Sequence, residues 1–282
     1  MKIENTIQGV RAALKQARKA GKSIAFVPTM GNLHRGHIAL VEEAKRRADF
    51  VVSSIFVNPT QFGANEDFAS YPRTLDNDAA LLAEADCDIL FAPSAHEMYP
   101  DGKQQATTVS VSGITEFLCG ASRPGHFTGV ATVVTKLLNI IQPDMAIFGE
   151  KDYQQLAVIR RLAAELCIPT TIASMPTQRA DDGLALSSRN GYLSAAEREK
   201  APLIYQTLVQ LQTAIISGQR DYPTLAQAAR EHLSKCGFTP DYVEIRSADL
   251  APAGKDQTDL VILVAAYLGK TRLIDNIAFS IQ

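Results

Sequence analysis

Several features that mark particular protein classes are scarce or absent in this sequence of 282 residues. Its 28 basic and 30 acidic residues leave a net charge of −2, so no positive excess indicates a nucleic acid or anionic membrane partner. The longest apolar run, residues 260–268, is far shorter than the roughly 20 residues of a membrane-spanning helix. Residues 1–21 carry charges throughout and lack the apolar core of a signal peptide. We therefore expect a cytoplasmic protein that binds neither nucleic acid nor membrane.

Cysteine is scarce as well, and its spacing excludes the usual cysteine-based scaffolds. The chain has four cysteines, which lie far apart and form no Cys-x-x-Cys pair: Cys87, Cys119, Cys167 and Cys236. This spacing favours free thiols in a reducing compartment over a disulfide framework or a zinc site.

The first part of the chain alternates helical and strand-like patterns. Apolar runs that read as strands lie at residues 24–27, 50–57, 89–91, 145–148 and 170–174, and Pro28 and Pro59 are expected to end the first two. Helical patterns lie at residues 7–20, 38–47, 75–85, 128–141 and 153–166. Short, continuously apolar strands separated by helices imply βαβ crossovers and a parallel sheet covered on both faces. We predict an α/β fold, a doubly wound, Rossmann-like parallel sheet.

The pattern changes after about residue 175. One long helix is predicted at residues 194–216, because Ser194 and Glu197 form a capping-box pattern. A second helix at 224–236 is followed by Gly237, a common helix-terminating residue. Strand-like runs follow at residues 242–246, 260–266 and 273–277. We therefore predict two domains, residues 1–176 and a smaller α+β domain at residues 177–282.

Residues 28–37, Pro-Thr-Met-Gly-Asn-Leu-His-Arg-Gly-His, follow the first predicted strand and open the next helix. In open α/β sheets, ligands bind at the carboxyl ends of the strands. Gly31 and Gly36 allow close approach of the backbone, and a helix N-terminus attracts anions. His34 and His37 can both project there and donate hydrogen bonds to phosphate oxygens. A metal pair or incidental surface histidines are the alternatives, although no other histidine has a context that supplies a third ligand.

The pattern His-x-Gly-His at this place resembles the HxGH nucleotidyltransferase superfamily, whose members attack the α-phosphate of a nucleotide and expel pyrophosphate. The longer string at 28–37 is similar to the pantoate–β-alanine ligase (pantothenate synthetase) family. Four further segments match that family in order: Phe-Val-Asn-Pro-Thr-Gln-Phe at 56–62, Arg-Pro-Gly-His-Phe at 123–127, Phe-Gly-Glu-Lys-Asp-Tyr-Gln-Gln at 148–155 and Leu-Ser-Ser-Arg-Asn at 186–190.

The resemblance implies an enzyme, a homodimer, that joins pantoate to β-alanine. In such an enzyme the pantoate carboxylate attacks the α-phosphate of ATP, pyrophosphate leaves, and β-alanine then displaces AMP from pantoyl adenylate. Mg²⁺ is expected on the phosphates, and no covalent enzyme intermediate is required. The C-terminal domain is expected to act as a lid that keeps water from the acyl adenylate.

The resemblance also implies roles for individual residues. The implied ATP-binding residues are Met30, Gly31, Asn32, Leu33, His34, Arg35, Gly36, His37, Gly149, Glu150, Lys151, Asp152, Gln178, Leu186, Ser187, Ser188 and Arg189. Gln61 and Gln155 are expected to bind pantoate. The implied catalytic residues, which position and stabilise the transferring phosphate, are His37, His34, Lys151 and Arg189.

Each of these segments has a plainer interpretation when taken alone. Residues 150–152 could be solvated charges at a helix start, Gln61 a turn residue, and residues 187–190 a polar turn. Leu186 occupies a place where methionine or lysine is common in the family. Arg123 and His126 could belong to a substrate loop or to a packed turn, and that choice stays open.

No protein ligand for Mg²⁺ is predicted, because the acidic stretch at residues 76–78 looks too exposed. Two other functions also stay open. One is an HxGH enzyme that adenylylates a phosphate ester, which would need a basic subsite for a second phosphate. The other is a nucleotide sensor without catalytic activity, for which binding alone would not require this full set of polar residues.

Overall fold

The computed structural model describes residues 1–64, 66–102 and 106–281, and the chain divides into two compact units. The first unit comprises Met1–Glu150 and Gln155–Pro176. The second comprises Lys151–Gln154 and Thr177–Gln282. The short segment Lys151–Gln154 therefore groups with the second unit, although the residues on either side of it in the sequence belong to the first.

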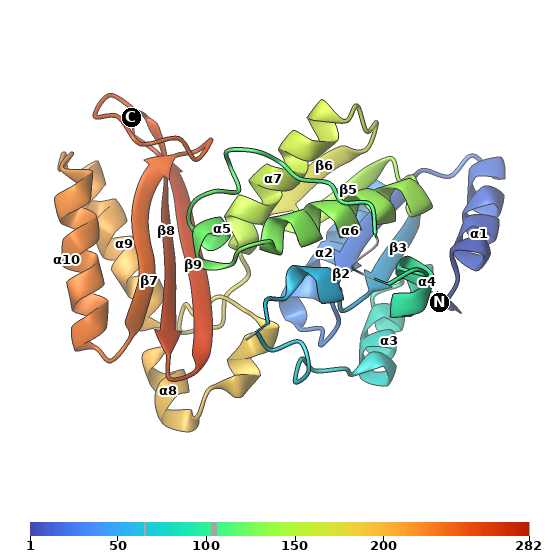
Figure 1. Cartoon of the computed structure of the whole chain (residues 1–282), viewed down its shortest axis with the longest axis horizontal. Helices are drawn as coiled ribbons and strands as arrows, with labels where there is room; N and C mark the ends of the chain where they lie inside the picture. Colours follow the sequence, from blue (N-terminus) through green and yellow to red (C-terminus); the bar gives the residue numbers. More distant parts are fainter. Residues whose placement is uncertain (65, 103–105, 282) are drawn as a thin grey trace. The chain divides into compact units, whose positions relative to one another are not determined.

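The first unit is built on a six-stranded sheet in which every pair of neighbouring strands is parallel (Figure 1). Along the sheet the strands are β1 (Lys2–Glu4), β4 (Ile89–Phe91), β3 (Phe50–Ile55), β2 (Ile24–Thr29), β5 (Met145–Gly149) and β6 (Thr171–Met175). The predicted doubly wound α/β fold is confirmed, and β1 is a strand that the sequence analysis did not predict.

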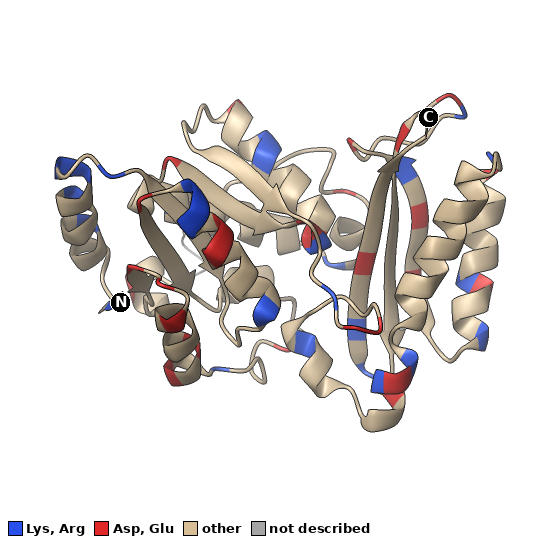
Figure 2. Cartoon of the chain, turned by 180° about the vertical axis from the view of Figure 1, so that it is seen from behind, with Lys and Arg blue, Asp and Glu red and all other residues tan. Residues whose placement is uncertain are grey.

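Helices cover both faces of this sheet. Those that cross between strands or flank the sheet are α1 (Ile7–Lys19), α2 (Arg35–Arg47), α3 (Leu75–Glu84), α4 (Ala95–Met98), α5 (Cys119–Ser122), α6 (His126–Ile141) and α7 (Tyr153–Glu165). Helices α6 and α7 lie on the face towards the viewer in Figure 1, and Figure 2 shows the face that α2 covers. The core on the α2 face includes Leu40, Val41 and Leu82, which pack on Val27 and Val51 of the strands.

Strand β2 runs further than predicted, because Pro28 does not end it. Pro28 pairs with Ser54 and Thr29 with Ile55 of β3. The Thr29 carbonyl accepts a hydrogen bond from the Phe56 N–H, so Thr29 faces β3 and Pro28 faces the other side. The pairing of β2 with β5 on that side reaches only to Phe26. A proline without an N–H is tolerated there because no partner strand needs the missing donor.

The second unit is an antiparallel sheet with helices on it. Its strands are β7 (Thr239–Ser247), β8 (Asp259–Leu268) and β9 (Thr271–Ser280), in that order across the sheet. Its helices are α8 (Ala195–Lys200), α9 (Leu203–Ile216) and α10 (Tyr222–Lys235). Helices α9 and α10 bury the apolar side of the sheet, with Leu208, Leu233, Ile262 and Val264 among the core residues. The predicted smaller α+β part is therefore observed.

The long helix predicted at residues 194–216 is wrong, because the structure has two helices. Helix α8 begins with the predicted capping box, in which Ser194 and Glu197 satisfy each other's backbone N–H groups. Pro202 then precedes α9 as its N-cap residue. Proline has no N–H for the helical hydrogen bond, and its ring collides with the carbonyl four residues earlier. One proline therefore separates two helices whose apolar patterns read as continuous.

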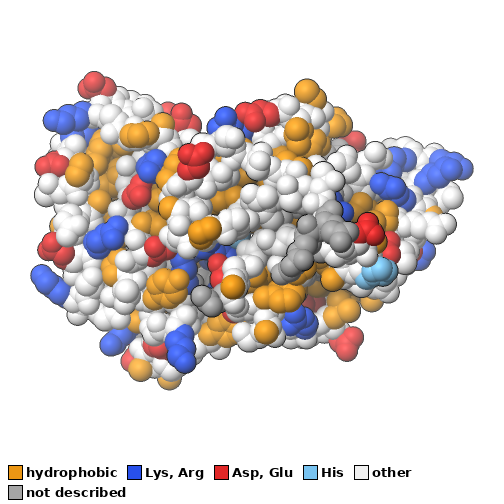
Figure 3. Space-filling model, viewed as in Figure 1, with side chains coloured by type: hydrophobic (Ala, Val, Ile, Leu, Met, Phe, Trp, Pro, Cys, Tyr) orange, Lys and Arg blue, Asp and Glu red, His pale blue; other side chains and the backbone are white. Residues whose placement is uncertain are grey.

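On the face that Figure 3 shows, the described residues of both charges are mixed. The positions of basic and acidic residues are interspersed along the ribbon in Figure 2, and the face in Figure 3 shows apolar side chains in small groups with charged ones between them. None of the helices in the described part of the chain has both the length and the apolarity needed to cross a membrane.

Candidate active site

The carboxyl ends of β2 and β5 lie next to each other at the edge of the sheet where ligands are expected. Strand β2 ends at Thr29 and has β3 on one side and β5 on the other. From β2 the chain passes to β3, whereas β5 and β6 extend the sheet in the opposite direction, so this is a topological switch point. Met30–His34 follow β2 directly, and Glu150 follows the end of β5 at Gly149. The fold therefore brings two of the predicted ATP segments to one edge.

The two histidines of the His-x-Gly-His segment cap the N-terminus of α2. Nδ1 of His34 accepts a hydrogen bond from the Gly36 N–H at 3.1 Å, and Nδ1 of His37 accepts one from the His34 N–H at 3.4 Å. The centres of the two rings are 4.1 Å apart. A neutral imidazole that accepts at Nδ1 carries its proton on Nε2. Both rings therefore hold an Nε2–H donor at a helix N-terminus, the arrangement that a phosphate requires.

Asp78 of α3 fixes the loop that leads to these histidines. Its carboxylate is fully buried and accepts hydrogen bonds from the N–H groups of Asn32 at 2.9 Å and Leu33 at 2.8 Å. The Thr74 hydroxyl donates a third hydrogen bond at 3.1 Å. Asn32 has a φ of 50°, which is uncommon for a residue other than glycine, and the hydrogen bond to its N–H helps to hold it there.

The prediction that residues 76–78 are exposed is wrong for Asp78. Asp76 and Asn77 are exposed, whereas Asp78 lies on the inner side of the helix, one turn before the buried Leu82. This spacing was the signal in the sequence, because residues four apart share a helix face. With both oxygens of Asp78 engaged by the loop, its carboxylate serves the loop backbone. Among the described residues, no group of three or more His, Cys, Asp and Glu side chains is placed to hold a metal ion.

Gln61, the predicted pantoate residue after β3, is buried and tightly held. It belongs to the 3-10 helix η1 (Pro59–Gln61). The Asn58 amide donates to Gln61 Oε1 at 3.0 Å, and the Tyr99 hydroxyl in turn donates to Asn58 Oδ1 at 2.9 Å. Gln61 Nε2 lies 3.0 Å from the sulfur of Met30. The structure thus brings Gln61 together with the first residue of the segment that follows β2.

Arg123 and His126 support η1 from behind. The Arg123 guanidinium donates to His126 Nε2 at 3.0 Å and to both oxygens of Glu66, at 2.7 and 2.6 Å. Because a guanidinium can only donate, His126 Nε2 is an acceptor and the ring proton is on Nδ1. That Nδ1–H donates to the Gln61 carbonyl at 2.8 Å. These two residues thus form a packed turn that holds the main chain of Gln61.

The Glu66–Arg123 ion pair gives a prediction about acid stability. Burial acts to raise the pKa of Glu66, but the hydrogen bonds and charge of Arg123 outweigh it, so this pKa lies below its usual value. A lowered native pKa contributes stability above the unfolded pKa and loses it as the pH falls through the native pKa. Glu66→Gln should therefore lower the free energy of unfolding by about 1 to 2 kcal/mol at pH 7. In denaturant titrations from pH 7 to pH 3, this difference should shrink; an equal difference at both ends would contradict the assignment.

Gly129 of α6 allows the helix to pass against η1. A Cβ atom at this position would lie 2.4 Å from the Thr60 carbonyl oxygen and 2.7 Å from Gln61 Cα. Both are backbone atoms, so they can give way only if η1 moves. Gly129→Ala should therefore raise the KM for pantoate on the order of tenfold or more, with a smaller change in the KM for ATP.

Steady-state kinetics with each substrate varied in turn would measure this effect. Gly254→Ala is the matched control, because no atom lies within 4 Å of the methyl group it would add. Equal kinetic constants for the two variants would show that η1 does not set pantoate binding.

In the second unit, a turn brings together the predicted residues at positions 178–189. Arg179 pairs with Ala185 in an isolated antiparallel bridge, and the Leu186 N–H donates to the Gln178 carbonyl at 2.9 Å. Ser187 then caps the 3-10 helix η3 (Ser188–Tyr192), where its hydroxyl accepts from the Arg189 N–H at 3.3 Å. Gln178 and Leu186 thus face each other across the turn, and the two serines and Arg189 follow directly.

Lys151 and Asp152 also belong to the second unit, in the 3-10 helix η2 (Glu150–Asp152). Their charged groups are 3.9 Å apart, a loose contact that leaves the lysine able to bind a phosphate. Glu150 remains in the first unit, where its carboxylate accepts from the Ser174 hydroxyl at 2.8 Å. Gln155 lies in the first turn of α7 and is half-buried.

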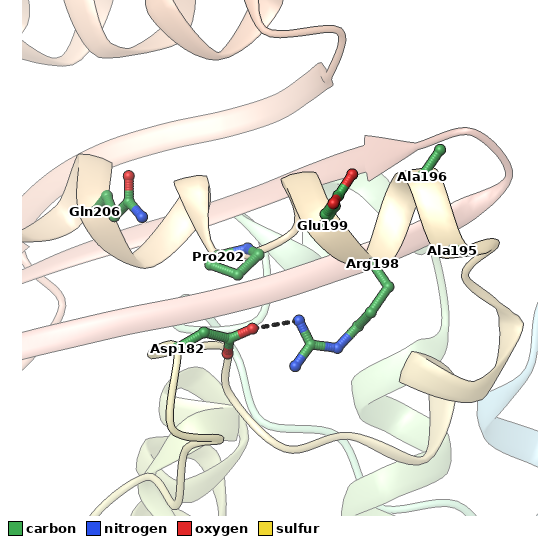
Figure 4. A pocket seen from close by; sticks show the side chains of 7 residues that line it. All are labelled: Asp182, Ala195, Ala196, Arg198, Glu199, Pro202 and Gln206. Carbon is green, nitrogen blue, oxygen red and sulfur yellow. Dashed lines mark hydrogen bonds and ion pairs between the residues drawn. The ribbon is translucent and has the colours of Figure 1, made fainter.

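An open groove of about 650 Å³ lies elsewhere in the second unit (Figure 4). An ion pair of 2.5 Å between Arg198 and Asp182 crosses it. The lining residues are Asp182, Ala195, Ala196, Arg198, Glu199, Pro202 and Gln206. None of them is a residue predicted to bind ATP or pantoate.

Sequence comparison with known proteins provides evidence independent of this geometry. The family model described as pantoate–β-alanine ligase matches residues 2–278. The pantothenate synthetase of Pseudomonas fluorescens (strain Pf0-1) is 59% identical over 283 residues, covering 100% of this chain and 99% of that protein. That of Pseudomonas putida (strain W619) is 60% identical over 278 residues, covering 98% and 97%.

Solved structures agree with the sequence comparison. The crystal structure of pantothenate synthetase from Thermus thermophilus has a TM-score of 0.92 and 47% identity, over 98% of this chain and 99% of that one. Pantoate–β-alanine ligase from Francisella tularensis, solved in complex with β-γ ATP and β-alanine, has a TM-score of 0.82 and 38% identity, over 98% and 97%. Because sequence and fold match over nearly its whole length, the chain belongs to the pantoate–β-alanine ligase family of pantothenate synthetases.

Proposed function

We propose that the chain condenses pantoate with β-alanine in two steps at the expense of ATP. In the first, a pantoate carboxylate oxygen attacks the α-phosphorus of ATP, and the bond to pyrophosphate breaks. In the second, the uncharged amine of β-alanine attacks the acyl carbon, the bond to AMP breaks, and the amine loses a proton. The ATP and β-alanine bound in the Francisella tularensis relative support the choice of substrates.

The observation that carries this proposal is the pair of Nε2–H donors at the N-terminus of α2. Negative charge builds up on the phosphate oxygens as pyrophosphate leaves, and fixed donors stabilise it without having to reorient. We propose that His34 and His37 donate to these oxygens, and that the main chain of Met30–Leu33, Arg35 and Gly36 lines the nucleotide.

We propose that the second unit supplies the other cationic and hydroxyl groups that bind the ATP phosphates. Lys151 and Arg189 would neutralise phosphate charge, and Ser187 and Ser188 would donate to it. Asp152, Gln178, Leu186, Gly149 and Glu150 complete the proposed ATP-binding set. Gln61 and Gln155 would hold pantoate through its hydroxyl and carboxylate groups.

The proposal also covers the metal ion, the lid, the cellular location and the oligomeric state. ATP is proposed to arrive as its Mg²⁺ complex, in which phosphates and water would hold the ion, as is usual for Mg²⁺. Among the described residues, no cluster of three or more His, Cys, Asp and Glu side chains could hold the ion.

The second unit is proposed to act as a lid that excludes water from the acyl adenylate. We also propose a cytoplasmic homodimer, as the family resemblance implies.

Pyrophosphate release from ATP tests the proposal directly. With pantoate and β-alanine present, release should be sustained and should match pantothenate formation mole for mole. With pantoate alone, it should stop after about one equivalent per site, because the adenylate has no amine to react with. Sustained release with a phosphate ester in place of pantoate would overturn the proposal in favour of a nucleotidylyltransferase. No release with any acceptor would favour a nucleotide sensor.

A further inference from the structure

Two neighbouring residues of β9, Asp275 and Asn276, make polar contacts that the proposed reaction does not use. Asp275 is 4% exposed, and its carboxylate receives two parallel hydrogen bonds from Arg179, at 2.6 and 2.8 Å. Burial raises the pKa of Asp275, and the guanidinium opposes that shift by stabilising the carboxylate. A charged side chain is rarely buried unless it is paired, and losing one partner of a buried pair is costly, so Asp275 and Arg179 hold each other in place.

The ion pair fixes the turn that leads to Ser187. Arg179 Nη1 also donates to the Gly183 carbonyl at 3.1 Å, and its guanidinium lies 3.8 Å from the centre of the Tyr205 ring. Gly183 has a φ of +92°, and a Cβ atom there would lie 2.5 Å from the same ring. Arg179 is therefore held on three sides, and it fixes the backbone on both arms of the turn.

Asn276 holds a different segment. Its Nδ2 donates to the carbonyl of Lys151 at 2.9 Å, across a separation of 125 residues in the sequence. The Tyr153 hydroxyl donates to the Ala248 carbonyl at 2.8 Å, a second attachment of the same segment. Both bonds tie Lys151–Gln154 to the sheet of the second unit, with which this segment groups.

We infer that Asp275 and Asn276 are positioning residues that hold the turn before Ser187 and the main chain of Lys151 in a fixed relation. The inference rests on the proposed function, in which Lys151 and Ser187–Arg189 bind the phosphates of ATP. Adjacent residues of one strand are about 3.3 Å apart along it and direct their side chains to opposite sides, so β9 anchors the two segments at neighbouring positions of one rigid strand. Binding groups fixed in advance lose less conformational entropy when the nucleotide binds.

The test compares Asn276→Ala with a control from the same sheet. Asp241→Asn removes the charge of another ion pair, in which Arg272 donates to Asp241 at 2.7 and 3.1 Å, two hydrogen bonds that involve neither nucleotide segment. Asn276→Ala should raise the KM for ATP about three- to tenfold, the effect of one hydrogen bond, and leave the KM for pantoate within about twofold. Asp241→Asn should leave both constants unchanged. Thermal unfolding of each variant reports any general loss of stability.

Asp275→Asn should raise the KM for ATP further, because it leaves the Arg179 charge without its partner. If that variant does not fold, Asn276→Ala alone decides. Equal changes in the KM values for ATP and pantoate, or an effect no larger than that of Asp241→Asn, would overturn the inference.

Calorimetric titration with a non-hydrolysable ATP analogue separates this inference from the proposed function. The Kd of Asn276→Ala should rise by the same three- to tenfold. If the wild-type protein binds the analogue but forms no pantothenate, the proposed function fails and the comparison of Kd values still decides the inference. If the wild-type protein neither binds the analogue nor forms pantothenate, both are overturned.

Discussion

Replacing His37 with alanine should lower kcat for pantothenate formation on the order of 10²- to 10³-fold, the usual effect of losing one fixed donor to a transition-state oxyanion. Its Nδ1 is occupied by the His34 N–H, so the ring presents Nε2–H as its donor. The loss should fall on kcat more than on the KM for ATP, because the charge on the phosphate grows only as pyrophosphate leaves.

His37→Ala also removes half of the capping box of α2, which costs about 1 kcal/mol of stability. Circular dichroism and thermal unfolding should therefore accompany the kinetics. His37→Gln is the informative companion, because its side-chain amide can donate from a similar position and should recover part of the rate. His96→Ala, an exposed histidine of α4, is the control. A loss of less than about tenfold in a folded His37→Ala protein would remove His37 from the catalytic residues.

Asp78→Asn should impair both stability and catalysis, although Asp78 is not expected to touch a substrate. At present the two carboxylate oxygens of Asp78 accept hydrogen bonds from two backbone N–H groups, one oxygen for each. The substitution replaces one of these oxygens with an NH₂ group, which cannot accept. One buried N–H then faces another donor, and a buried hydrogen bond to a charge is lost. We expect the free energy of unfolding to fall by about 2 to 4 kcal/mol.

The catalytic effect of Asp78→Asn should follow from the displaced loop. Asn32 and Leu33 directly precede His34, so a shift of the loop moves both imidazoles away from the phosphate, and kcat should fall about tenfold or more. Asp76→Asn in the same helix is exposed and should change neither quantity. Urea titrations and initial rates, both at a temperature where the variant is folded, would measure the two effects. Unchanged rates with reduced stability would show that Asp78 supports the fold without positioning His34.

The sequence was sufficient for features that local patterns record. Alternating apolar strands and helices predicted the parallel sheet, because strands buried on both faces must be continuously apolar. The string at residues 28–37 predicted two histidines at the start of a helix, since both the glycines and the helix start lie within ten residues. Pro202 shows where such patterns fail, because the apolar spacing on both sides of it reads as one helix.

How these residues are held depends on contacts between distant segments. Asp78 meets Leu33 across 45 positions, and Asn276 meets Lys151 across 125. No local pattern records such pairs, because a hydrogen bond between distant segments depends on how the strands and turns fold together. The tolerance of Pro28 within β2 also depends on a distant segment. The pairing with β5 ends before Pro28, so no partner there needs the N–H that proline lacks. Local patterns were thus enough to predict the fold class and to propose the reactive side chains, whereas the packing of distant segments selects the buried polar groups that hold the segments carrying them.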